Sequence, residues 1–252
     1  MRVLGIIPAR YASSRFPGKP LADIDGKPMI WYVYQAAHKA LDEVVVATDD
    51  ERIFDAVKEF GGEVVMTSTE HRSGTDRCAE ALDLYSLVTN ENFDIVVNIQ
   101  GDEPLIEPEV IETLAKSFDC KTQIATLINR EDNIEVLQNP NVVKVIRDKN
   151  GDAIYFSRSI IPFVRGEKPE DWPRKHVFYR HVGIYAYRSE VLSEITKLPP
   201  GLLEQAESLE QNRWIENGYK IKTIITDYSS IGVDTPEDLK QVEQITKQNL
   251  PE

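Results

Sequence analysis

The chain has 252 residues, of which 41% are hydrophobic and 28% charged, with 13 glycines and 14 prolines. A chain of this length and composition can bury a substantial core, which excludes a collagen-like, low-complexity or disordered protein. Acidic residues outnumber basic ones by 42 to 29, and the net charge of −13 argues against broad binding to nucleic acid or to anionic membranes.

The cysteines and the N-terminus bear on the cell compartment. Cys78 and Cys120 lie far apart, with no CxxC pair and no Cys/His cluster, so we expect neither a zinc site nor a disulfide framework. The N-terminal apolar run stops at Pro8, and no apolar run reaches the roughly 18 residues of a membrane span. We therefore expect a cytoplasmic protein without a signal peptide.

The first half of the sequence alternates short apolar runs with helical patterns. Strands are expected at residues 3–7, 44–48, 63–66, 94–100 and 123–128, and helices at 28–40, 51–60, 75–87 and 108–118. The runs at 44–46 and 95–97 lack the alternation of a half-exposed strand, which indicates strands covered on both faces. Strand, helix and strand in succession predict an α/β fold with a mostly parallel central sheet and helices on both faces.

The pattern changes after about residue 141. Strands are expected at 142–147, 153–156, 182–188 and 220–226, and helices over 203–217 and from Pro236 onwards. A polar stretch at about 158–180 suggests a smaller, partly antiparallel sheet or an arm. Because no Gly/Ser-rich linker, repeat or composition break interrupts the chain, we expect a single domain over residues 1–252.

The segment after the first strand is unusually basic. Residues 1–22 carry Arg2, Arg10, Arg15 and Lys19 and no acid. Such a cluster is a solvated loop or a site for an anion, and guanidinium groups bind phosphate oxygens in a bidentate way. Ligands of open α/β sheets bind beyond the carboxyl ends of strands. We therefore favour a polyphosphate site.

Two common nucleotide motifs are absent. A P-loop ending at Gly18-Lys19 would need glycine at position 13 and serine or threonine at position 20, where the chain has Ser13 and Pro20. GxGxxG does not occur in the sequence either. These absences exclude a Walker site and count against a nicotinamide oxidoreductase.

Two aspartates follow glycine-containing turns. Asp102 lies in the segment QGDEP after the fourth expected strand, and Asp234 lies in GVDTP before the last helix. Mg²⁺ on a triphosphate is usually held by one or two carboxylates together with phosphate oxygens and waters. Both aspartates are therefore candidate metal ligands, although Asp102 could be a turn residue and Asp234 only a helix N-cap.

Weaker patterns leave alternatives open. The segment 73–75 could cap a helix or present backbone N–H groups to a nucleotide, and the turn at 48–50 has the same ambiguity. The basic stretch 158–181 could receive an acidic co-substrate or form a surface arm. His38 and His71 have no metal-ligand spacing, and no GxSxG or Cys/His pair suggests a covalent nucleophile.

Together these segments resemble the 3-deoxy-manno-octulosonate cytidylyltransferase (CMP-Kdo synthetase) family. The matching stretches include IIPARYASSRFPGKPL at 6–21, HRSGTDR at 71–77, VVNIQGDEP at 96–104, RHVGIYAYR at 180–188 and GVDTPEDL at 232–239. They occur in order over nearly the whole chain. The chain departs from the family at Asn212, where an apolar residue is common, and over 163–179.

The resemblance implies a Rossmann-like nucleotidyltransferase fold, usually a homodimer, that uses CTP and Mg²⁺. It implies that CTP and 3-deoxy-manno-octulosonate (Kdo) react to give CMP-Kdo and diphosphate, for lipopolysaccharide biosynthesis. Three alternatives are carried beside it: the same reaction on 8-amino-Kdo or another 3-deoxy-ulosonic acid, a nicotinamide oxidoreductase, and a nucleotide-binding module without catalysis.

The family's functional residues carry over to matching positions. The resemblance implies that triphosphate binding and charge stabilisation fall to Arg10, Arg15 and Lys19. Asp102 and Asp234 would hold the metal, and Asp102 would orient the attacking hydroxyl. Further nucleotide contacts are expected at Ala9, Ser73, Gly74, Thr75 and Arg77, and Gln100 would lie where base and sugar meet. Sugar-acid contacts are expected at Arg158, His181, Tyr185, Glu210 and Gln211, with Arg158 at the carboxylate.

Overall fold

The computed structural model describes residues 1–12, 15–229 and 231–249. The chain divides into two compact units, unit 1 with residues 1–115 and 230–252 and unit 2 with residues 116–229. This division describes compactness only, so the single nucleotidyltransferase domain expected over residues 1–252 stays a prediction. No helix among the described residues is both long and apolar enough to cross a membrane.

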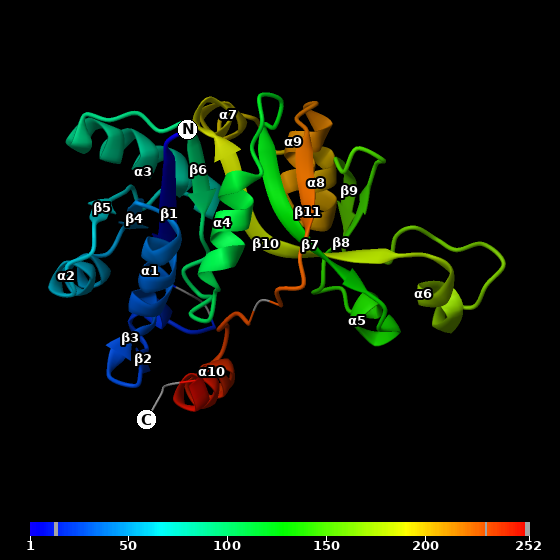
Figure 1. Cartoon of the computed structure of the whole chain (residues 1–252), viewed down its shortest axis with the longest axis horizontal. Helices are drawn as coiled ribbons and strands as arrows, with labels where there is room; N and C mark the ends of the chain where they lie inside the picture. Colours follow the sequence, from blue (N-terminus) through cyan, green and yellow to red (C-terminus); the bar gives the residue numbers. More distant parts are fainter. Residues whose placement is uncertain (13–14, 230, 250–252) are drawn as a thin grey trace. The chain divides into compact units, whose positions relative to one another are not determined.

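Unit 1 is built on four parallel strands in the order β6-β1-β4-β5 (Figure 1). Their bounds are β1 (Val3–Ala9), β4 (Glu43–Thr48), β5 (Val64–Met66) and β6 (Ile95–Asn98). All four were expected, and every residue of β6 is buried, as its unbroken apolar run predicts.

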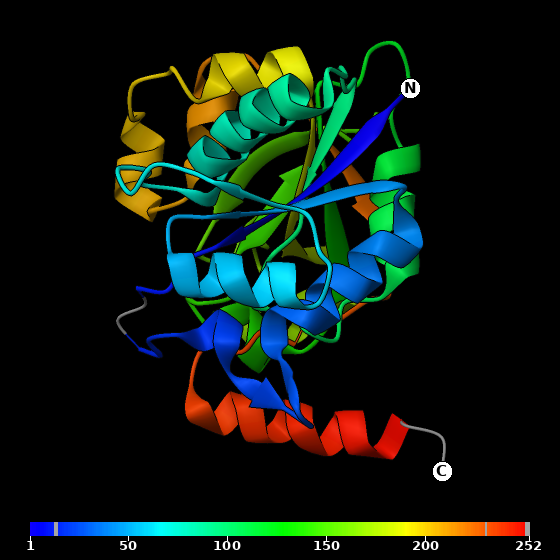
Figure 2. The same cartoon turned by 90° about the vertical axis from the view of Figure 1, so that its left-hand side faces the viewer.

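Helices cover both faces of this sheet, which confirms the predicted α/β class. They are α1 (Met29–Ala40), α2 (Glu51–Glu59), α3 (Gly74–Thr89) and α4 (Pro108–Lys116), whereas α10 (Pro236–Asn249) packs against residues 23–24. Figure 2 shows α3 on one side of the strands and α1 and α2 on the other. A short 3-10 helix η1 (Lys19–Leu21) and the hairpin of β2 (Asp23–Ile24) and β3 (Lys27–Pro28) were not predicted.

A small apolar cluster joins the C-terminal segment to this hairpin. Val233 is fully buried with Ile24, Met29 and Val242. The N–H of Val233 also donates to the carbonyl of Asp102 at 2.9 Å. These contacts hold the backbone at Val233 in place and thereby position the next residue, Asp234.

Unit 2 contains a mixed sheet. Its strands are β7 (Ile124–Glu131), β8 (Lys144–Arg147), β9 (Ala153–Ser157), β10 (Phe178–Arg188) and β11 (Ile221–Ile225). β7 runs parallel to β11 and antiparallel to β10, and β8 pairs antiparallel with β10 and β9. The antiparallel pairing expected in this part of the chain is therefore present, but these strands belong to the same nine-stranded sheet as β1 and β6, so the expected second sheet is not formed here.

Short helices complete unit 2, and several sequence predictions need correction there. The helices are α5 (Ile134–Gln138), η2 (Pro169–Asp171), α6 (Trp172–Lys175), α7 (Ser189–Ile195), α8 (Leu202–Glu207) and α9 (Glu210–Glu216). The single helix expected over 203–217 is two helices, because Ser208 adopts a left-handed conformation with φ 52° that interrupts helical hydrogen bonding. β10 begins at Phe178, so the predicted arm at 158–180 ends in strand.

Candidate active site

The loop after β1 forms one wall of a cavity of about 390 Å³ in unit 1. The other walls come from the start of α3 and from the loop after β6. The lining residues are Pro8, Ala9, Arg10, Ala12, Lys19, Pro20, Gly74, Gln100, Gly101 and Asp102. Six candidate site residues, distant in sequence, thus meet at one cavity beyond the carboxyl ends of parallel strands. Ser13 and Ser14 of the same loop lie outside the described residues.

Lys19 joins both candidate metal ligands. Its Nζ lies 2.7 Å from Oδ2 of Asp102 and 3.4 Å from Oδ1 of Asp234. Its side chain is only 13% exposed. Arg15, which is largely exposed, places Nη1 3.1 Å from Oδ2 of Asp234. The structure therefore brings two cations of the opening loop and the two aspartates into direct contact.

The capping alternative for Asp234 does not hold, because Thr235 caps α10. The hydroxyl of Thr235 accepts from the N–H of Asp238 at 3.2 Å. The carboxylate of Asp238 accepts in return from the N–H groups of Asp234 and Thr235 at 3.0 and 2.9 Å. This reciprocal capping satisfies the helix start and leaves the carboxylate of Asp234 to face Lys19 and Arg15.

Arg10 carries a charge that the protein does not neutralise. The residue is partly buried, and its guanidinium makes no hydrogen bond or ion pair with any residue that the structure describes. Burial lowers its pKa, and the positive charge of Arg77 lowers it further, while Asp49 and Asp76 act in the opposite sense. An anion in the cavity would supply the missing counter-charge.

Arg77 and its neighbours at the start of α3 lie behind this cavity. Arg77 is fully buried, with Nη2 2.6 Å from Oδ2 of Asp49 and Nη1 2.5 Å from Oγ1 of Thr67. Ser73 caps α3 by accepting from the N–H of Asp76 at 3.1 Å. Of the predicted contacts in this segment, only Gly74 lines the cavity, whereas Ser73, Thr75 and Arg77 do not.

Asp49 belongs to the turn at 48–50, for which the sequence left open a capping role or a contact with a nucleotide. Its neighbour Asp50 caps α2 by accepting from the N–H of Arg52, so the acidic turn divides into a cap and a counter-ion. The sequence did contain a local signal for this role, because the turn has two adjacent acids and capping of α2 requires only Asp50. Its partner, 28 residues further along the chain, could not be read from the turn itself.

Gly101 is needed for the cavity's shape. A Cβ at this position would lie 2.8 Å from the carbonyl oxygen of Pro8, a distance at which the backbone itself must move. The glycine therefore allows the loop after β6 to approach the end of β1 and places Asp102 beside Lys19.

The donor set at Asp102 and Asp234 suits Mg²⁺. The described residues contain no group of three or more His, Cys, Asp or Glu that could hold a metal alone. Two partly exposed carboxylates nevertheless converge on one cationic position, that of Lys19 Nζ. Mg²⁺ characteristically takes one or two protein carboxylates and completes its shell with phosphate oxygens and water, so these residues fit the ion when a nucleotide is bound.

Apart from Gln100, which lines the cavity of unit 1, the predicted sugar-acid contacts lie in unit 2. Arg158 follows β9, and its guanidinium donates to the carbonyls of Glu207 at 2.7 Å, Pro140 at 3.0 Å and Ser208 at 3.4 Å. A guanidinium has five N–H donors, so two remain after these bonds. Arg158 therefore anchors the loop before α9 and keeps limited capacity for a ligand.

Glu207 anchors the same corner. Its carboxylate accepts from the hydroxyls of Tyr155 and Ser157 at 3.1 and 2.6 Å and from the N–H of Arg158 at 3.0 Å. The hydrogen bond from Ser157 contributes to lowering the pKa of Glu207. The carboxylate thus links β9 to the end of α8.

An aromatic cluster joins β10 to α9. The ring of Tyr185 lies 5.1 Å from that of His181 and 5.2 Å from that of Trp214. Burial raises the pKa of Tyr185 well above 10, and the charge of Glu210 adds to the effect. His181, Tyr185 and Glu210 are therefore neighbours. Gln211 is buried at the first turn of α9.

Asn212, the departure from the family pattern, has a structural role. It is fully buried and bridges both backbone groups of Phe156 in β9. The N–H of Phe156 donates to its Oδ1 at 3.3 Å, and its Nδ2 donates to the carbonyl of Phe156 at 2.9 Å. The side-chain amide thus forms with Phe156 the two hydrogen bonds that a neighbouring strand would form.

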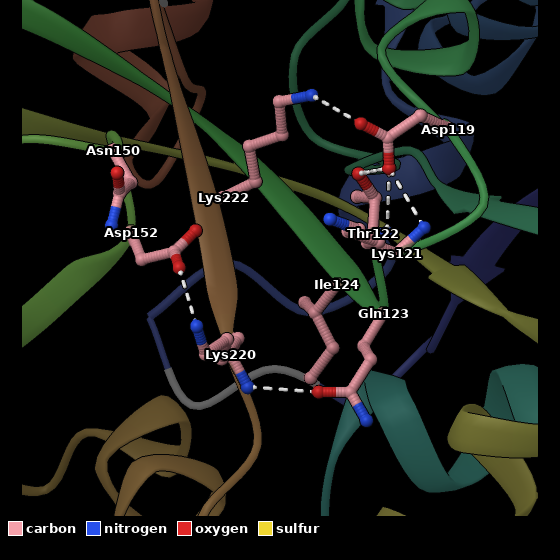
Figure 3. Close-up of a pocket in the computed structure, with 9 residues that line it drawn as sticks. All are labelled: Asp119, Lys121, Thr122, Gln123, Ile124, Asn150, Asp152, Lys220 and Lys222. Carbon is pink, nitrogen blue, oxygen red and sulfur yellow. Dashed lines mark hydrogen bonds and ion pairs between the residues drawn. The ribbon is translucent and has the colours of Figure 1, made fainter.

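A second cavity of about 400 Å³ lies in unit 2 at the start of β7 and β11 (Figure 3). It contains none of the candidate site residues. Two of its lysines face its own acids: Lys220 Nζ lies 3.2 Å from Asp152, and Lys222 Nζ lies 3.8 Å from Asp119. Its charges are therefore largely compensated in place, unlike those around Arg10.

A parallel sheet whose opening loop sets cations against two aspartates is the arrangement expected of a nucleotide-dependent transferase. A family model described as cytidylyltransferase matches residues 4–224. The chain is 59% identical to the 3-deoxy-manno-octulosonate cytidylyltransferase of Parabacteroides distasonis, over 96% of both chains. It is 56% identical to the enzyme of that name from Bacteroides thetaiotaomicron, over 98% of this chain and 99% of that one.

The fold agrees with this relationship. A solved structure of CMP:2-keto-3-deoxy-manno-octonic acid synthetase in complex with CTP has a TM-score of 0.89 and 43% identity, over 99% of this chain and all of the other. The chain belongs to the 3-deoxy-manno-octulosonate cytidylyltransferase family.

Proposed function

We propose that this chain transfers the cytidylyl group of CTP to Kdo and so forms CMP-Kdo and diphosphate. Three relatives that are more than 50% identical to this chain are named 3-deoxy-manno-octulosonate cytidylyltransferase. The observation in the molecule that supports it most directly is the guanidinium of Arg10, which is partly buried without a counter-ion at a cavity that also holds Lys19 and Asp102.

The reaction joins an oxygen of the sugar acid to phosphorus. The anomeric hydroxyl oxygen forms a bond to the α-phosphorus, the bond from the α-phosphorus to the oxygen that bridges it to the β-phosphorus breaks, and the hydroxyl proton passes to water. Diphosphate carries the leaving electron pair. No covalent enzyme intermediate is required, so catalysis depends on positioning and charge neutralisation.

The residues of unit 1 account for both requirements. Arg10, Arg15 and Lys19 bind triphosphate oxygens, and Lys19 exchanges its carboxylate partners for phosphate when CTP enters. Asp102 and Asp234 would hold Mg²⁺, which neutralises phosphate charge and makes phosphorus more electrophilic when bound. Arg77 keeps its pairs with Asp49 and Thr67, and these pairs hold the start of α3 in position.

The test is a diphosphate-release assay that crosses the four common nucleoside triphosphates with Kdo, 8-amino-Kdo and a sialic acid. We expect release with CTP and Kdo together, and none with either alone. Preference for 8-amino-Kdo would replace the substrate in this proposal. CTP binding without release would identify a nucleotide-binding module.

Asp102→Asn removes one carboxylate and should abolish most of the turnover while the fold survives. Asp55→Asn, an exposed change in α2, is the matched control and should remain fully active. A chelator should stop release in the unmodified protein, and added Mg²⁺ should restore it. Full turnover in Asp102→Asn or in excess chelator would contradict the assignment.

We further propose that the chain forms a homodimer. Ile154, Phe163 and Val177 of unit 2 are each more than half exposed, and a partner subunit that covered them would remove these large apolar side chains from water. Light scattering should give twice the chain mass, and Phe163→Asp should shift it towards the monomer. A monomeric mass for the unmodified protein at micromolar concentration would overturn this proposal.

A further inference from the structure

His181 lies beside an irregularity in β10. The register between β10 and β7 shifts between Val182 and Tyr185, so the carbonyl of Ile184 is available to a side chain. Thr126 of β7 is fully buried at this point. Its Oγ1 lies 2.7 Å from the carbonyl oxygen of Ile184 and 2.9 Å from Nε2 of His181.

The threonine hydroxyl has one proton to give. Two oxygens 2.7 Å apart are held at that distance by a proton between them. Thr126 therefore donates to Ile184 rather than to the carbonyl of Val182, which lies further away at 3.3 Å, or to the hydroxyl of Tyr185, which is also close to it. Towards His181 the threonine oxygen can only accept, so the proton of the imidazole must sit on Nε2.

Burial lowers the pKa of His181 to about 3, which favours the neutral imidazole, although the residue keeps part of its surface exposed. Nδ1 is then an unprotonated nitrogen with a lone pair, and it makes no hydrogen bond with any described residue. The ring is held edge-on to Phe156, with centroids 5.2 Å apart and planes at 82°. The side chain thus presents an acceptor in a fixed orientation.

We propose that Thr126 is a positioning residue that fixes His181 as its neutral Nε2–H tautomer, so that Nδ1 accepts a hydrogen bond from a hydroxyl of the sugar acid. The inference rests on the proposed function, since it concerns the sugar substrate of that reaction. A lone pair repels a carboxylate and matches a hydroxyl donor. Binding of the carboxylate is therefore left to the two remaining donors of Arg158.

The tautomer can be observed directly. Long-range ¹⁵N–¹H spectra of the full-length protein should show four imidazoles, one for each histidine in the chain, and His181→Gln identifies the signal of interest. We expect a protonated Nε2 and a bare Nδ1 from mildly acidic to mildly alkaline pH. An Nδ1–H tautomer or an imidazolium in the unmodified protein would overturn the inference, and this measurement needs no variant to fold.

Kinetics separate positioning from structure. Thr126→Val should raise the KM for the sugar by about tenfold, roughly the effect of one hydrogen bond, leave the KM for CTP unchanged and disturb the tautomer. Thr126→Ser should restore both. The matched control is Thr223→Val, because Thr223 is the register partner of Thr126 on β11 and donates to the carbonyl of Gly151. Equal sugar KM values for the two valine variants would refute the inference.

Substrate analogues test the acceptor itself. In a set of Kdo analogues with single hydroxyl-to-fluorine replacements, one position should lose binding in the unmodified protein but not in His181→Gln. Equal losses in both proteins at every position would count against the inference. Absence of diphosphate release with Kdo would instead refute the proposed function, whereas an Nδ1–H tautomer refutes the inference with activity intact.

Discussion

At the scale of the residue, Arg10 shows how a side chain without a partner indicates a ligand. A partly buried guanidinium that feels the like charge of Arg77 and lacks an ion pair costs free energy unless an anion neutralises it. Sequence alone placed Arg10 in a basic loop, but the missing counter-ion became visible only with the neighbouring strands in place.

Arg10→Gln should therefore raise the KM for CTP by about ten- to a hundredfold, the value of a hydrogen bond to a charged group. Steady-state diphosphate release measures it. Arg2→Gln is the matched control, because Arg2 belongs to the same basic segment but pairs with Glu91 and Glu43 at the other end of β1. Identical KM values in the two variants would show that Arg10 does not bind the nucleotide.

Asn212 is a second residue-scale case. Asn212→Leu should destabilise the protein by about 1–3 kcal/mol, because the N–H and carbonyl of Phe156 would lose their partner in a buried position. Urea unfolding followed by circular dichroism gives the change. Asn92→Leu, an exposed change in the segment before β6, should change stability by less than about 0.5 kcal/mol. An unaltered midpoint for Asn212→Leu would mean that the strand edge does not depend on the amide.

At the scale of the element, the site depends on where strands end. β1 and β6 are parallel neighbours, and the turn after β6 passes so close to Pro8 that only glycine fits at position 101. Apolar periodicity predicted both strands, because burial on two faces leaves a continuous apolar run. The close approach depends on backbone geometry that no periodicity records.

Gly101→Ala should lower both stability and CTP affinity, because the added methyl group forces the loop away from the carbonyl of Pro8. We expect a loss of about 1–3 kcal/mol of stability, typical of overpacking, measured by thermal unfolding together with the KM for CTP. Gly183→Ala serves as the control, since a Cβ there meets no atom within 4 Å. If both variants melt at the same temperature, the contact with Pro8 does not constrain the turn.

At the scale of the whole molecule, stability at a given pH sums over every group that titrates on unfolding. His181 has a pKa lowered from 6.5 to about 3 in the folded state, so the unfolded chain binds more protons between these values. Its contribution is therefore present above pH 6.5 and is lost as the pH falls towards 3.

Chemical unfolding between pH 4 and 8 should show stability of the unmodified protein falling below about pH 6.5, with a shallower fall in His181→Gln. His38→Gln is the matched control, because it removes a histidine that is exposed on α1. Parallel curves for all three proteins would mean that His181 titrates normally.

Much of unit 1 could be predicted from sequence, whereas unit 2 was less accessible. Strands such as β4 and β6 identify themselves by apolar runs, and α3 by its capping residues. In unit 2 the left-handed Ser208 divides an otherwise periodic helix, and α5 and α7 are too short to show a pattern. Short elements owe their stability to packing, which a local window of sequence does not contain.

The sequence by itself determined the alternation of strands and helices, the basic loop after β1 and the motifs that identify the family, because these are local properties of composition and order. The tertiary structure alone decided that Thr235 rather than Asp234 caps α10, that Asp49 holds Arg77, and that Thr126 faces His181. The pairs of Arg77 with Asp49 and of Thr126 with His181 depend on which distant groups meet once the chain has folded. The choice of cap depends on the backbone at residues 234 and 235, because both side chains carry an oxygen that could accept from the helix start.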